Sequence, residues 1–383
     1  MKKIIRVTTV PASLTGLLHG QLKFMSKYYD MIGVSSKGNK NQLYIVTKQE
    51  GIPAVAIEMT RKITPFKDLK AVWQLYTLFK KEKPFIVHSH TPKAGTLSML
   101  AAKLAGVPHR LHTIAGLPLL EATGFKRIVL NAVEKVTYAC ASKIYPNSLG
   151  LQDIIIEHKF TKKNKLKVIG NGSSNGIDVE RFNPNDFNDI KKKTALQKSL
   201  NINNTDFVFV FIGRLVADKG INELIIAFDK MGKLHDNIKL LLVGDYEKEL
   251  DPLLPEVLNI IEQNKKIIST GWVNDVRPYF AISDVLTFPS YREGFPNVVM
   301  QAGAMGLPCI VTNINGCNEI IIDGENGTII PVKNSETLYN KMFGVYESKI
   351  KFDSEKCRGL ITSRYQQQVV WNALLEEYKK LKC

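Results

Sequence analysis

The sequence predicts an α/β protein made of two Rossmann-like, doubly wound domains. The chain has 383 residues, which exceeds the size at which a single hydrophobic core usually keeps growing. In the first half, short apolar runs alternate with segments of helical periodicity, as expected for a parallel sheet covered by helices. A second alternating series follows in the second half, so we expect the same kind of domain twice.

The first domain is expected to contain a sheet whose strands are separated by helices. Its strands are expected at Ile4–Val10, Met31–Val34, Ala54–Ile57, Phe85–His88, Arg110–Thr113 and Lys143–Tyr145. Between them, helical patterns cover Phe66–Lys81, Lys93–Ala105 and Lys126–Ala141.

The domain boundary is expected near residue 178. Residues 170–184, GNGSSNGIDVERFNP, are rich in Gly, Asn and Ser, which is typical of a connection between domains. We therefore place the first domain at residues 1–178 and the second at residues 179–365. The amphipathic segment 366–383 could cover either half, and we assign it to the first. Two such domains would face each other across a central cleft, where ligands bind in these folds.

The second domain repeats the same order of elements. Its strands are expected at Phe207–Ile212, Leu240–Val243, Ile267–Thr270, Val285–Phe288 and Cys309–Val311, and its helices at Asn222–Leu234 and Asn297–Met305.

Composition favours a reduced, cytoplasmic, globular protein. Hydrophobic residues make up 44% of the chain and charged residues 23%, close to the globular average. No apolar run approaches the roughly 18 residues of a membrane-spanning helix. The cysteines are scattered without metal-ligand spacing, so we expect neither disulfides nor a zinc site. They are Cys140, Cys309, Cys317, Cys357 and Cys383.

The excess positive charge lies in the first half. Residues 1–185 hold 28 Lys and Arg against 11 Asp and Glu, a net charge of +17, whereas the rest holds 24 against 25. A basic surface attracts nucleic acid or an anionic membrane. The sequence has no helix-turn-helix, RNA-binding or zinc-finger pattern, so we favour the membrane and expect no nucleic acid. Lysines that only keep the protein soluble would give the same charge.

Residues 211–220, FIGRLVADKG, run from an apolar strand through Gly213 and two cations into a helix. A glycine allows the backbone to approach a ligand closely, and a helix start offers free N–H groups to an anion. Arg214 and Lys219 would neutralise a nucleoside diphosphate. A tight turn with solvated charges would show the same pattern.

Residues 290–297, SYREGFPN, lie between another expected strand and a helix. Gly294 would let this loop pass close to a ligand, and Asn297 would cap the helix. Glu293 would accept hydrogen bonds from sugar hydroxyls beside the helix start. An ordinary charge that complements the helix dipole is the alternative for this glutamate.

The first half offers weaker signals. His88 and His90 in VHSHTPKAG lie two residues apart at the end of a strand, so their side chains should project to the same side. One of them could face the reacting carbon, although a histidine at a strand end is often structural. The loop Ser13–Gly16 lacks the dinucleotide glycine pattern and is a weak phosphate-loop signal. The absence of Asp-x-Asp disfavours a carboxylate-bound metal.

Together these segments resemble the family 4 retaining glycosyltransferases of GT-B fold, over nearly the whole chain. The resemblance is carried by SYREGFPNVVMQAGAMGLPCIVTNINGCNEII, FIGRLVADKG and NGIDVERF. In the first half, HSHTPKAG and RLHTIAGLP are similar to the bacterial subgroup that assembles capsular, O-antigen and other lipid-linked glycans.

The resemblance implies a role for each matching residue. Arg214 and Lys219 would hold the donor pyrophosphate beside Gly213, Glu293 would contact hydroxyls of the donor sugar, and His90 would lie near that sugar. The family retains anomeric configuration by front-face attack, so leaving-group stabilisation and positioning would matter most. Gly294, Phe295, Pro296 and Asn297 would surround sugar and phosphate, and Thr15 and Gly16 would lie near donor or acceptor.

The sequence departs from the family at one position. Eight residues after Glu293, the family usually has a second glutamate that binds the nucleotide ribose, whereas this chain has Gln301. Exchanging a charged acceptor for a neutral one should weaken donor binding by about 1 to 2 kcal/mol.

From this resemblance we expect a metal-independent glycosyltransferase that needs no cofactor. It would move a hexose or N-acetylhexosamine from a nucleotide sugar, preferably a UDP sugar, to a polyprenyl-diphosphate-linked saccharide. It would act as a peripheral protein on the cytoplasmic face of the cell membrane. The alternatives are a UDP-sugar epimerase of the same fold and a catalytically weak protein that binds sugar nucleotides.

Overall fold

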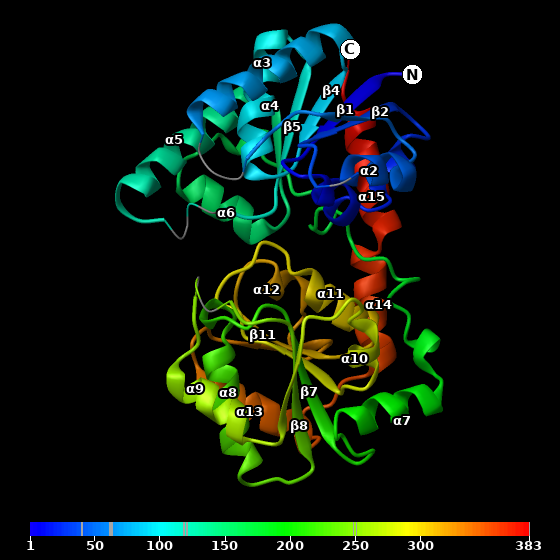
Figure 1. The fold of residues 1–383 in the computed structure, drawn as a ribbon, viewed down its shortest axis with the longest axis vertical. Helices are drawn as coiled ribbons and strands as arrows, with labels where there is room; N and C mark the ends of the chain where they lie inside the picture. Colours follow the sequence, from blue (N-terminus) through cyan, green and yellow to red (C-terminus); the bar gives the residue numbers. More distant parts are fainter. Residues whose placement is uncertain are drawn as a thin grey trace. The chain divides into compact units, whose positions relative to one another are not determined.

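The chain forms two compact units. The computed structural model describes residues 1–39, 41–60, 64–117, 119, 122–247, 249 and 251–382. One unit contains Met1–Gly176 together with Gln367–Cys383, and the other contains Ile177–Gln366 (Figure 1). The predicted boundary at residue 178 lies next to the change of unit. The final helix belongs to the first unit.

The first unit is built on a parallel sheet with the strand order β3-β2-β1-β4-β5-β6. The chain winds from β1 outward through β2 to β3, and then returns to place β4 on the other side of β1. The predicted strands are all present. They are β1 (Lys3–Val7), β2 (Asp30–Ser35), β3 (Ala54–Ala56), β4 (Ile86–Ser89), β5 (His109–Ile114) and β6 (Lys143–Pro146).

The predicted first strand was too long. It ends at Val7 instead of Val10, because the chain turns into a helical loop that begins before Ser13. The apolar run alone could not show this, since a residue such as Val10 suits either a strand end or a loop that packs on the core.

Three predicted helices of the first unit are present, and their starts are sharper than expected. Both α3 (Pro65–Glu82) and α4 (Pro92–Ala105) begin at a proline, which fits the first helical position because its missing N–H would be unpaired there. The third predicted helix is α5 (Gly124–Cys140). Several shorter elements were not predicted. They are the π-helical turn η1 (Ser13–Leu17), α1 (Gln21–Met25), α2 (Gln42–Glu50) and α6 (Leu149–Glu157).

The two faces of this sheet carry different cores, because successive residues of a strand point to opposite sides. From β1, Ile5 and Val7 pack in the cluster that contains Leu75 of α3 and Met99 of α4. Ile4 packs on the other face with Leu374 of α15 (Gln367–Lys379). Figure 1 shows α15 against this second face of the sheet.

The second unit repeats the architecture with the strand order β12-β11-β10-β7-β8-β9. Here the winding reverses between β9 and β10, so β10 lies beside β7. The predicted strands appear as β7 (Phe207–Ile212), β8 (Ile238–Val243), β9 (Ile267–Gly271), β10 (Val285–Phe288) and β11 (Cys309–Thr312), with an additional edge strand β12 (Gly327–Ile330). Two six-stranded parallel sheets with flanking helices confirm the predicted fold class.

The helices of the second unit surround one apolar core. The two predicted helices are α8 (Ile221–Gly232) and α11 (Asn297–Ala304). The others are α7 (Ile190–Ser199), α9 (Pro255–Gln263), α10 (Arg277–Ala281), α12 (Cys317–Ile320), α13 (Ser335–Tyr346) and α14 (Ser354–Tyr365).

The structure bears on the cysteines and on membrane-spanning segments. Cys140, Cys309, Cys317 and Cys357 are free and buried, whereas Cys383 lies outside the described residues. Within the described parts of the chain, no helix is both long enough and apolar enough to span a bilayer.

A buried polar network joins α15 to the sheet of the first unit. Arg6 of β1 is fully buried, and its Nη1 donates a 2.9 Å hydrogen bond to the Tyr378 hydroxyl. The same hydroxyl hydrogen-bonds to His88 Nδ1. The Tyr378 hydroxyl therefore forms hydrogen bonds with two buried side chains.

Replacing Tyr378 by Phe is expected to lower the free energy of unfolding by about 1 to 3 kcal/mol, because buried Arg6 and His88 both lose a partner. Urea denaturation followed by circular dichroism measures this change. Tyr44→Phe is the control, since Tyr44 is 65% exposed. Equal stability of Tyr378→Phe and the unmodified chain would contradict the structural role of this hydroxyl.

Candidate functional site

The two motifs of the second unit meet where the strand order reverses. The segment that holds Arg214 and Lys219 follows β7, and the segment that holds Glu293 follows β10. Strands β7 and β10 are neighbours in the sheet. Ligands of doubly wound folds bind outside the carboxyl ends of the strands at such a reversal, so both motifs lie where a ligand is expected.

A glycine permits the contact between these two segments. Gly220 has φ +70°, and a Cβ there would lie 2.1 Å from the carbonyl oxygen of Pro289. The backbone N–H of Tyr291 donates a 2.8 Å hydrogen bond to the carbonyl oxygen of Asp218. Close backbone packing therefore fixes the end of one motif against the start of the other.

Lys219 and Glu293 form an ion pair across this contact. Their Nζ and Oε1 atoms lie 2.5 Å apart, and the side chains are only 15% and 18% exposed. Ser290 Oγ donates to the same carboxylate oxygen at 3.1 Å. Because water screens a partly buried pair less than an exposed one, this pair is a stronger electrostatic feature than a surface salt bridge.

Arg214 lies on the same segment as Lys219 but has a different partner. Its Nη1 lies 2.6 Å from Glu247 Oε2, and this pair is much more exposed. The structure thus brings Lys219 together with Glu293, while Arg214 is held by a carboxylate that the motif did not indicate. An exposed pair of this kind contributes little stability, so the guanidinium can exchange partners readily.

The segment after Glu293 contributes backbone more than side chains. Phe295 is buried, and its ring packs 5.4 Å from that of Tyr365. Gly316, with φ +79°, lies so close that a Cβ there would be 2.6 Å from the carbonyl oxygen of Gly294. Asn315 Nδ2 donates to the carbonyl oxygen of Glu293. Together these contacts hold the backbone of Gly294–Pro296 in place.

The prediction that Asn297 caps the following helix was wrong. Asn297 is the first helical residue of α11, Pro296 occupies the cap position, and no side chain caps this end. The Asn297 side chain is exposed instead. Gln301 lies one turn further along α11 and is partly exposed.

Sequence reasoning missed several residues that shape this site. Arg292 Nη2 lies 2.7 Å from Asp218 Oδ2, which links the two segments a second time. The Tyr291 hydroxyl donates to Glu223 of α8 at 2.6 Å. The Asn315-Gly316 dipeptide was a usable turn signal. No local sequence pattern indicated that Arg292 pairs with Asp218 or that Tyr291 bonds to Glu223. The two members of each pair lie far apart in the sequence.

His88 and His90 of the first unit project to the same side, as predicted, with ring centroids 4.4 Å apart. His88 is structural: it bonds to Tyr378, and its Nε2 lies 2.8 Å from Thr113 Oγ1. His90 lies beside the reversal between β1 and β4, and its Nε2 is 2.7 Å from Arg6 Nη2. Burial, together with the positive charge of Arg6, lowers the pKa of both rings well below the usual value, so both are neutral.

The loop after β4 is held beside the end of β1. Thr91 has φ +128°, a strained conformation for a β-branched residue. Its hydroxyl accepts a 3.1 Å hydrogen bond from the N–H of Thr9 and lies 2.7 Å from the Thr9 hydroxyl. These contacts fix the backbone next to His90.

Thr15 and Gly16 lie on η1, after β1. The Thr15 hydroxyl makes a long hydrogen bond of 3.5 Å to the carbonyl oxygen of Pro11. Gly16 is exposed, and a Cβ there would meet no atom within 4 Å. The fold therefore does not require glycine at this position.

Comparison with known protein families gives two matches along the chain. The family described as glycosyl transferases group 1 matches residues 192–362. The glycosyl transferase 4-like domain matches residues 38–172.

Comparison with individual proteins points in the same direction. The chain is 36% identical to the capsular polysaccharide biosynthesis glycosyltransferase CapM of Staphylococcus aureus, over 98% of this chain and 97% of that protein. It is 32% identical to the Escherichia coli UDP-Gal:alpha-D-GlcNAc-diphosphoundecaprenol alpha-1,3-galactosyltransferase, over 80% and 78%. The structure of Anabaena Alr3699/HepE in complex with UDP shares the fold, with a TM-score of 0.79 at 17% identity over 100% of both chains.

Replacing Gly220 by Ala is expected to destabilise the second unit, because the new methyl group would clash with the carbonyl oxygen of Pro289. Gly359→Ala is the matched control: Gly359 is exposed in helix α14 and a Cβ there meets nothing within 4 Å, so alanine should stabilise by about 0.5 to 1 kcal/mol. Thermal unfolding measures both effects. Unchanged stability of Gly220→Ala would contradict the tight packing of Gly220 against Pro289.

Proposed function

This chain belongs to the glycosyl transferases group 1 family and is a glycosyltransferase, and we propose that it transfers a hexose or N-acetylhexosamine from a UDP sugar to a lipid-linked saccharide. The observation that carries this proposal is the ion pair between Lys219 and Glu293 at the reversal of the strand order. A cation and a carboxylate in contact there match the two halves of a sugar diphosphate. The cation suits the phosphates, and the carboxylate suits the sugar hydroxyls.

We propose that the donor diphosphate takes the place of Glu293 as the partner of Lys219. Glu293 Oε1 lies 2.5 Å from the Lys219 ammonium and neutralises it. When the diphosphate binds, Lys219 can turn to the phosphate oxygens and Glu293 can accept hydrogen bonds from the sugar. Arg214 would leave its exposed pair with Glu247 and supply a second cation. The Gly294–Pro296 backbone and the first turn of α11 would contact the same ligand.

In the proposed mechanism the site stabilises the leaving group. As the bond between the sugar and the diphosphate breaks, negative charge grows on the phosphate oxygens, and fixed cations stabilise that charge. The acceptor hydroxyl would attack from the same face and pass its proton to the departing phosphate, which retains the anomeric configuration. Lys219 and Arg214 would supply the positive charge that a metal supplies elsewhere, so no metal is required.

The relatives support a lipid-linked acceptor. One is named for a diphosphoundecaprenol acceptor and a UDP-galactose donor, and another for capsular polysaccharide biosynthesis. We propose that this chain acts in the same class of reaction, at the inner face of the cell membrane. Gln301 would bind the ribose through its carbonyl group, more weakly than a glutamate.

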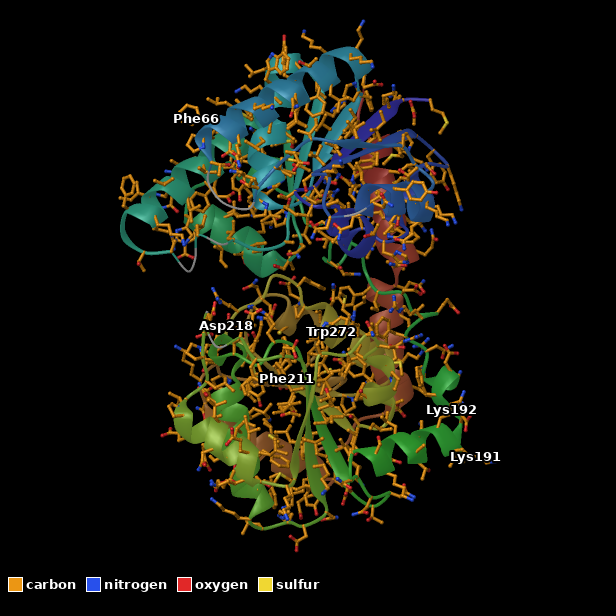
Figure 2. All side chains as sticks on the ribbon, viewed as in Figure 1. Phe66, Lys191, Lys192, Phe211, Asp218 and Trp272 are labelled. Carbon is orange, nitrogen blue, oxygen red and sulfur yellow. The ribbon has the colours of Figure 1, made fainter. Side chains whose placement is uncertain are left out.

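An exposed apolar surface in the first unit supports contact with the membrane. Phe66, Leu69 and Trp73 of α3 are 89%, 67% and 67% exposed, and Phe125 of α5 is 80% exposed. Figure 2 shows Phe66 projecting from the start of α3. The neighbouring Lys67, Lys70 and Lys126 are exposed as well. Apolar side chains flanked by lysines suit an anionic bilayer.

Replacing Lys219 by Ala is expected to weaken binding of UDP about 10- to 150-fold, because one charge-assisted interaction with the diphosphate is lost. A thermal-shift panel of nucleotide sugars first identifies the donor, since a ligand that binds only the native state raises the unfolding temperature. Titration calorimetry then compares the variants. Lys230→Ala is the control, because Lys230 pairs with Glu336 on the surface of the second unit.

Turnover tests the reaction itself. The wild-type enzyme should transfer sugar to a polyprenyl-diphosphate-linked saccharide in the presence of EDTA, with retention at the anomeric carbon. Activity that is lost with the chelator and restored by manganese would overturn the metal-independent mechanism. Epimerised UDP sugar formed without any acceptor would instead indicate an epimerase.

Replacing Phe66, Leu69 and Trp73 together by Ser is expected to reduce sedimentation with anionic vesicles, because the apolar contact with the bilayer is lost. Binding of the wild-type protein should fall as salt rises. Trp272→Ser is the matched control, because Trp272 is 68% exposed but belongs to the second unit (Figure 2). Equal binding to neutral and anionic vesicles would exclude the electrostatic part of the proposal.

A further inference from the structure

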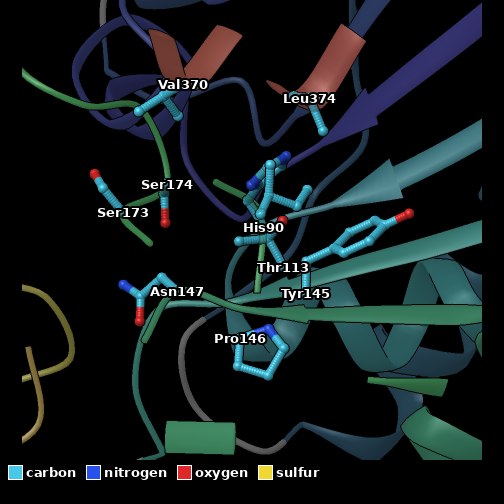
Figure 3. A pocket seen from close by; sticks show the side chains of 10 residues that line it. His90, Thr113, Tyr145, Pro146, Asn147, Ser173, Ser174, Val370 and Leu374 are labelled. Carbon is cyan, nitrogen blue, oxygen red and sulfur yellow. The ribbon is translucent and has the colours of Figure 1, made fainter. Parts of the chain in front are cut away.

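A small cavity in the first unit is lined by polar atoms that have no partner. Its volume is about 20 Å³, which suffices for one water molecule or one hydroxyl group. Three buried atoms of its lining residues make no hydrogen bond to any described residue: His90 Nδ1, Asn147 Oδ1 and Ser174 Oγ. Figure 3 shows these side chains around the cavity. Because unsatisfied buried polar atoms are rare, three of them around one cavity indicate a site suited to a polar group.

Arg6 determines what His90 can offer to this occupant. A guanidinium can only donate, so His90 Nε2, at 2.7 Å from Arg6 Nη2, must accept. A neutral imidazole that accepts at Nε2 carries its proton at Nδ1. The unpaired Nδ1 is therefore a hydrogen-bond donor.

The groups around His90 keep it neutral. Arg6 contacts it directly, and His88 lies 4.4 Å away between ring centroids. Burial lowers the pKa of His90, and the charge of Arg6 lowers it further; His88 and His112 act in the same direction. With Nε2 engaged and Nδ1 already protonated, His90 has no free lone pair and cannot act as a general base.

Besides His90, two groups hold Arg6 in place. Tyr378 of α15 accepts at 2.9 Å, and Gln21 Oε1 accepts at 2.5 Å from Arg6 Nη2. Gln21 Nε2 in turn donates to Asn175 Oδ1 at 3.0 Å. The cavity wall continues with Val370 and Leu374 of α15. The C-terminal helix therefore both orients Arg6 and closes one side of the cavity.

The cavity lies at the carboxyl ends of three strands of the first unit. Thr113 belongs to the end of β5, Asn147 directly follows β6, and His90 directly follows β4. The carboxyl ends of parallel strands are the ligand-binding edge of a doubly wound sheet. Ser173, on the opposite wall, is held at φ +68° and accepts a 2.9 Å hydrogen bond from the N–H of Gly176.

We propose that this cavity is a subsite for a single hydroxyl group of a sugar substrate. The hydroxyl accepts a hydrogen bond from His90 Nδ1–H and donates one to Asn147 Oδ1, and Ser174 Oγ forms a third hydrogen bond with it. Arg6 is a positioning residue that fixes the tautomer of His90. The inference rests on the proposed function for the sugar that carries the hydroxyl. That sugar is either the donor or the saccharide acceptor.

The tautomer is tested by nuclear magnetic resonance on the full chain labelled with ¹⁵N. The sequence has seven histidines, and His90→Gln identifies the signals of His90. We expect a neutral ring protonated at Nδ1 that does not titrate between about pH 5 and 8. A ring protonated at Nε2, or one that titrates in this range, overturns the assigned role of Arg6.

The subsite is tested with Ser174→Ala and Asn147→Leu, with Asn372→Leu on the exposed side of α15 as control. The probes are UDP, UDP-glucose, UDP-galactose, UDP-N-acetylglucosamine and UDP-N-acetylgalactosamine. Binding of UDP should stay unchanged. If the hydroxyl belongs to the donor, affinity for the UDP sugar should fall about five- to thirtyfold. If it belongs to the acceptor, KM for the acceptor should rise by a similar factor instead.

The outcomes separate this inference from the proposed function. If the wild-type chain neither binds UDP nor transfers sugar, the proposed function fails. If it transfers sugar normally, and neither variant changes donor affinity or acceptor KM, the subsite is wrong although the function stands. Ser174→Ala removes only one hydroxyl from a loop, so it keeps the test decisive if Asn147→Leu does not fold.

Discussion

In both units the winding of the chain reverses beside the first strand, and this reversal determines which residues can meet. In the first unit β4 lies beside β1, and in the second β10 lies beside β7. Neighbouring crossovers leave in opposite directions there, so the carboxyl ends of the two strands are open to a ligand. The loops with Lys219 and Glu293 flank one such point. The contact between Thr9 and Thr91, next to His90, lies at the corresponding point of the first unit.

The final helix has a chemical as well as a packing role in the first unit. Its apolar side packs on the sheet through Leu374 and Leu375, while Tyr378 bonds to buried Arg6. A buried guanidinium is costly unless its donors are paired. Nη1 and Nη2 of Arg6 have neutral partners in Tyr378, Gln21 and His90, whereas its buried Nε bonds to no described residue. Because these partners are neutral, the positive charge of Arg6 remains to bias the protonation of His90. The network thus connects the end of the chain to the candidate subsite.

Charged residues of the second unit are paired with each other. Lys219 pairs with Glu293, Arg214 with Glu247, and Arg292 with Asp218. Such pairs hold the cations near their working positions and avoid an uncompensated charge in a partly buried site. These pairs also select among ligands. An anion displaces the carboxylate from its cation only if it binds the cation more strongly than the carboxylate does. In the proposed mechanism a diphosphate, with its several oxygens, would meet that requirement.

The sequence by itself determined the two-domain α/β fold, the positions of most strands, and the two motifs that flank the β7–β10 reversal. Local signals suffice for these, because apolar periodicity and turn residues act over a few neighbouring positions. Short elements such as α1 and β12 carry too few residues for such a signal. Only the tertiary structure decided that Asn297 begins a helix without capping it, that Arg214 pairs with Glu247, and that Arg6 lies against His90. Those outcomes depend on strand order and on contacts between residues as far apart as Arg6 and Tyr378, which local patterns do not encode.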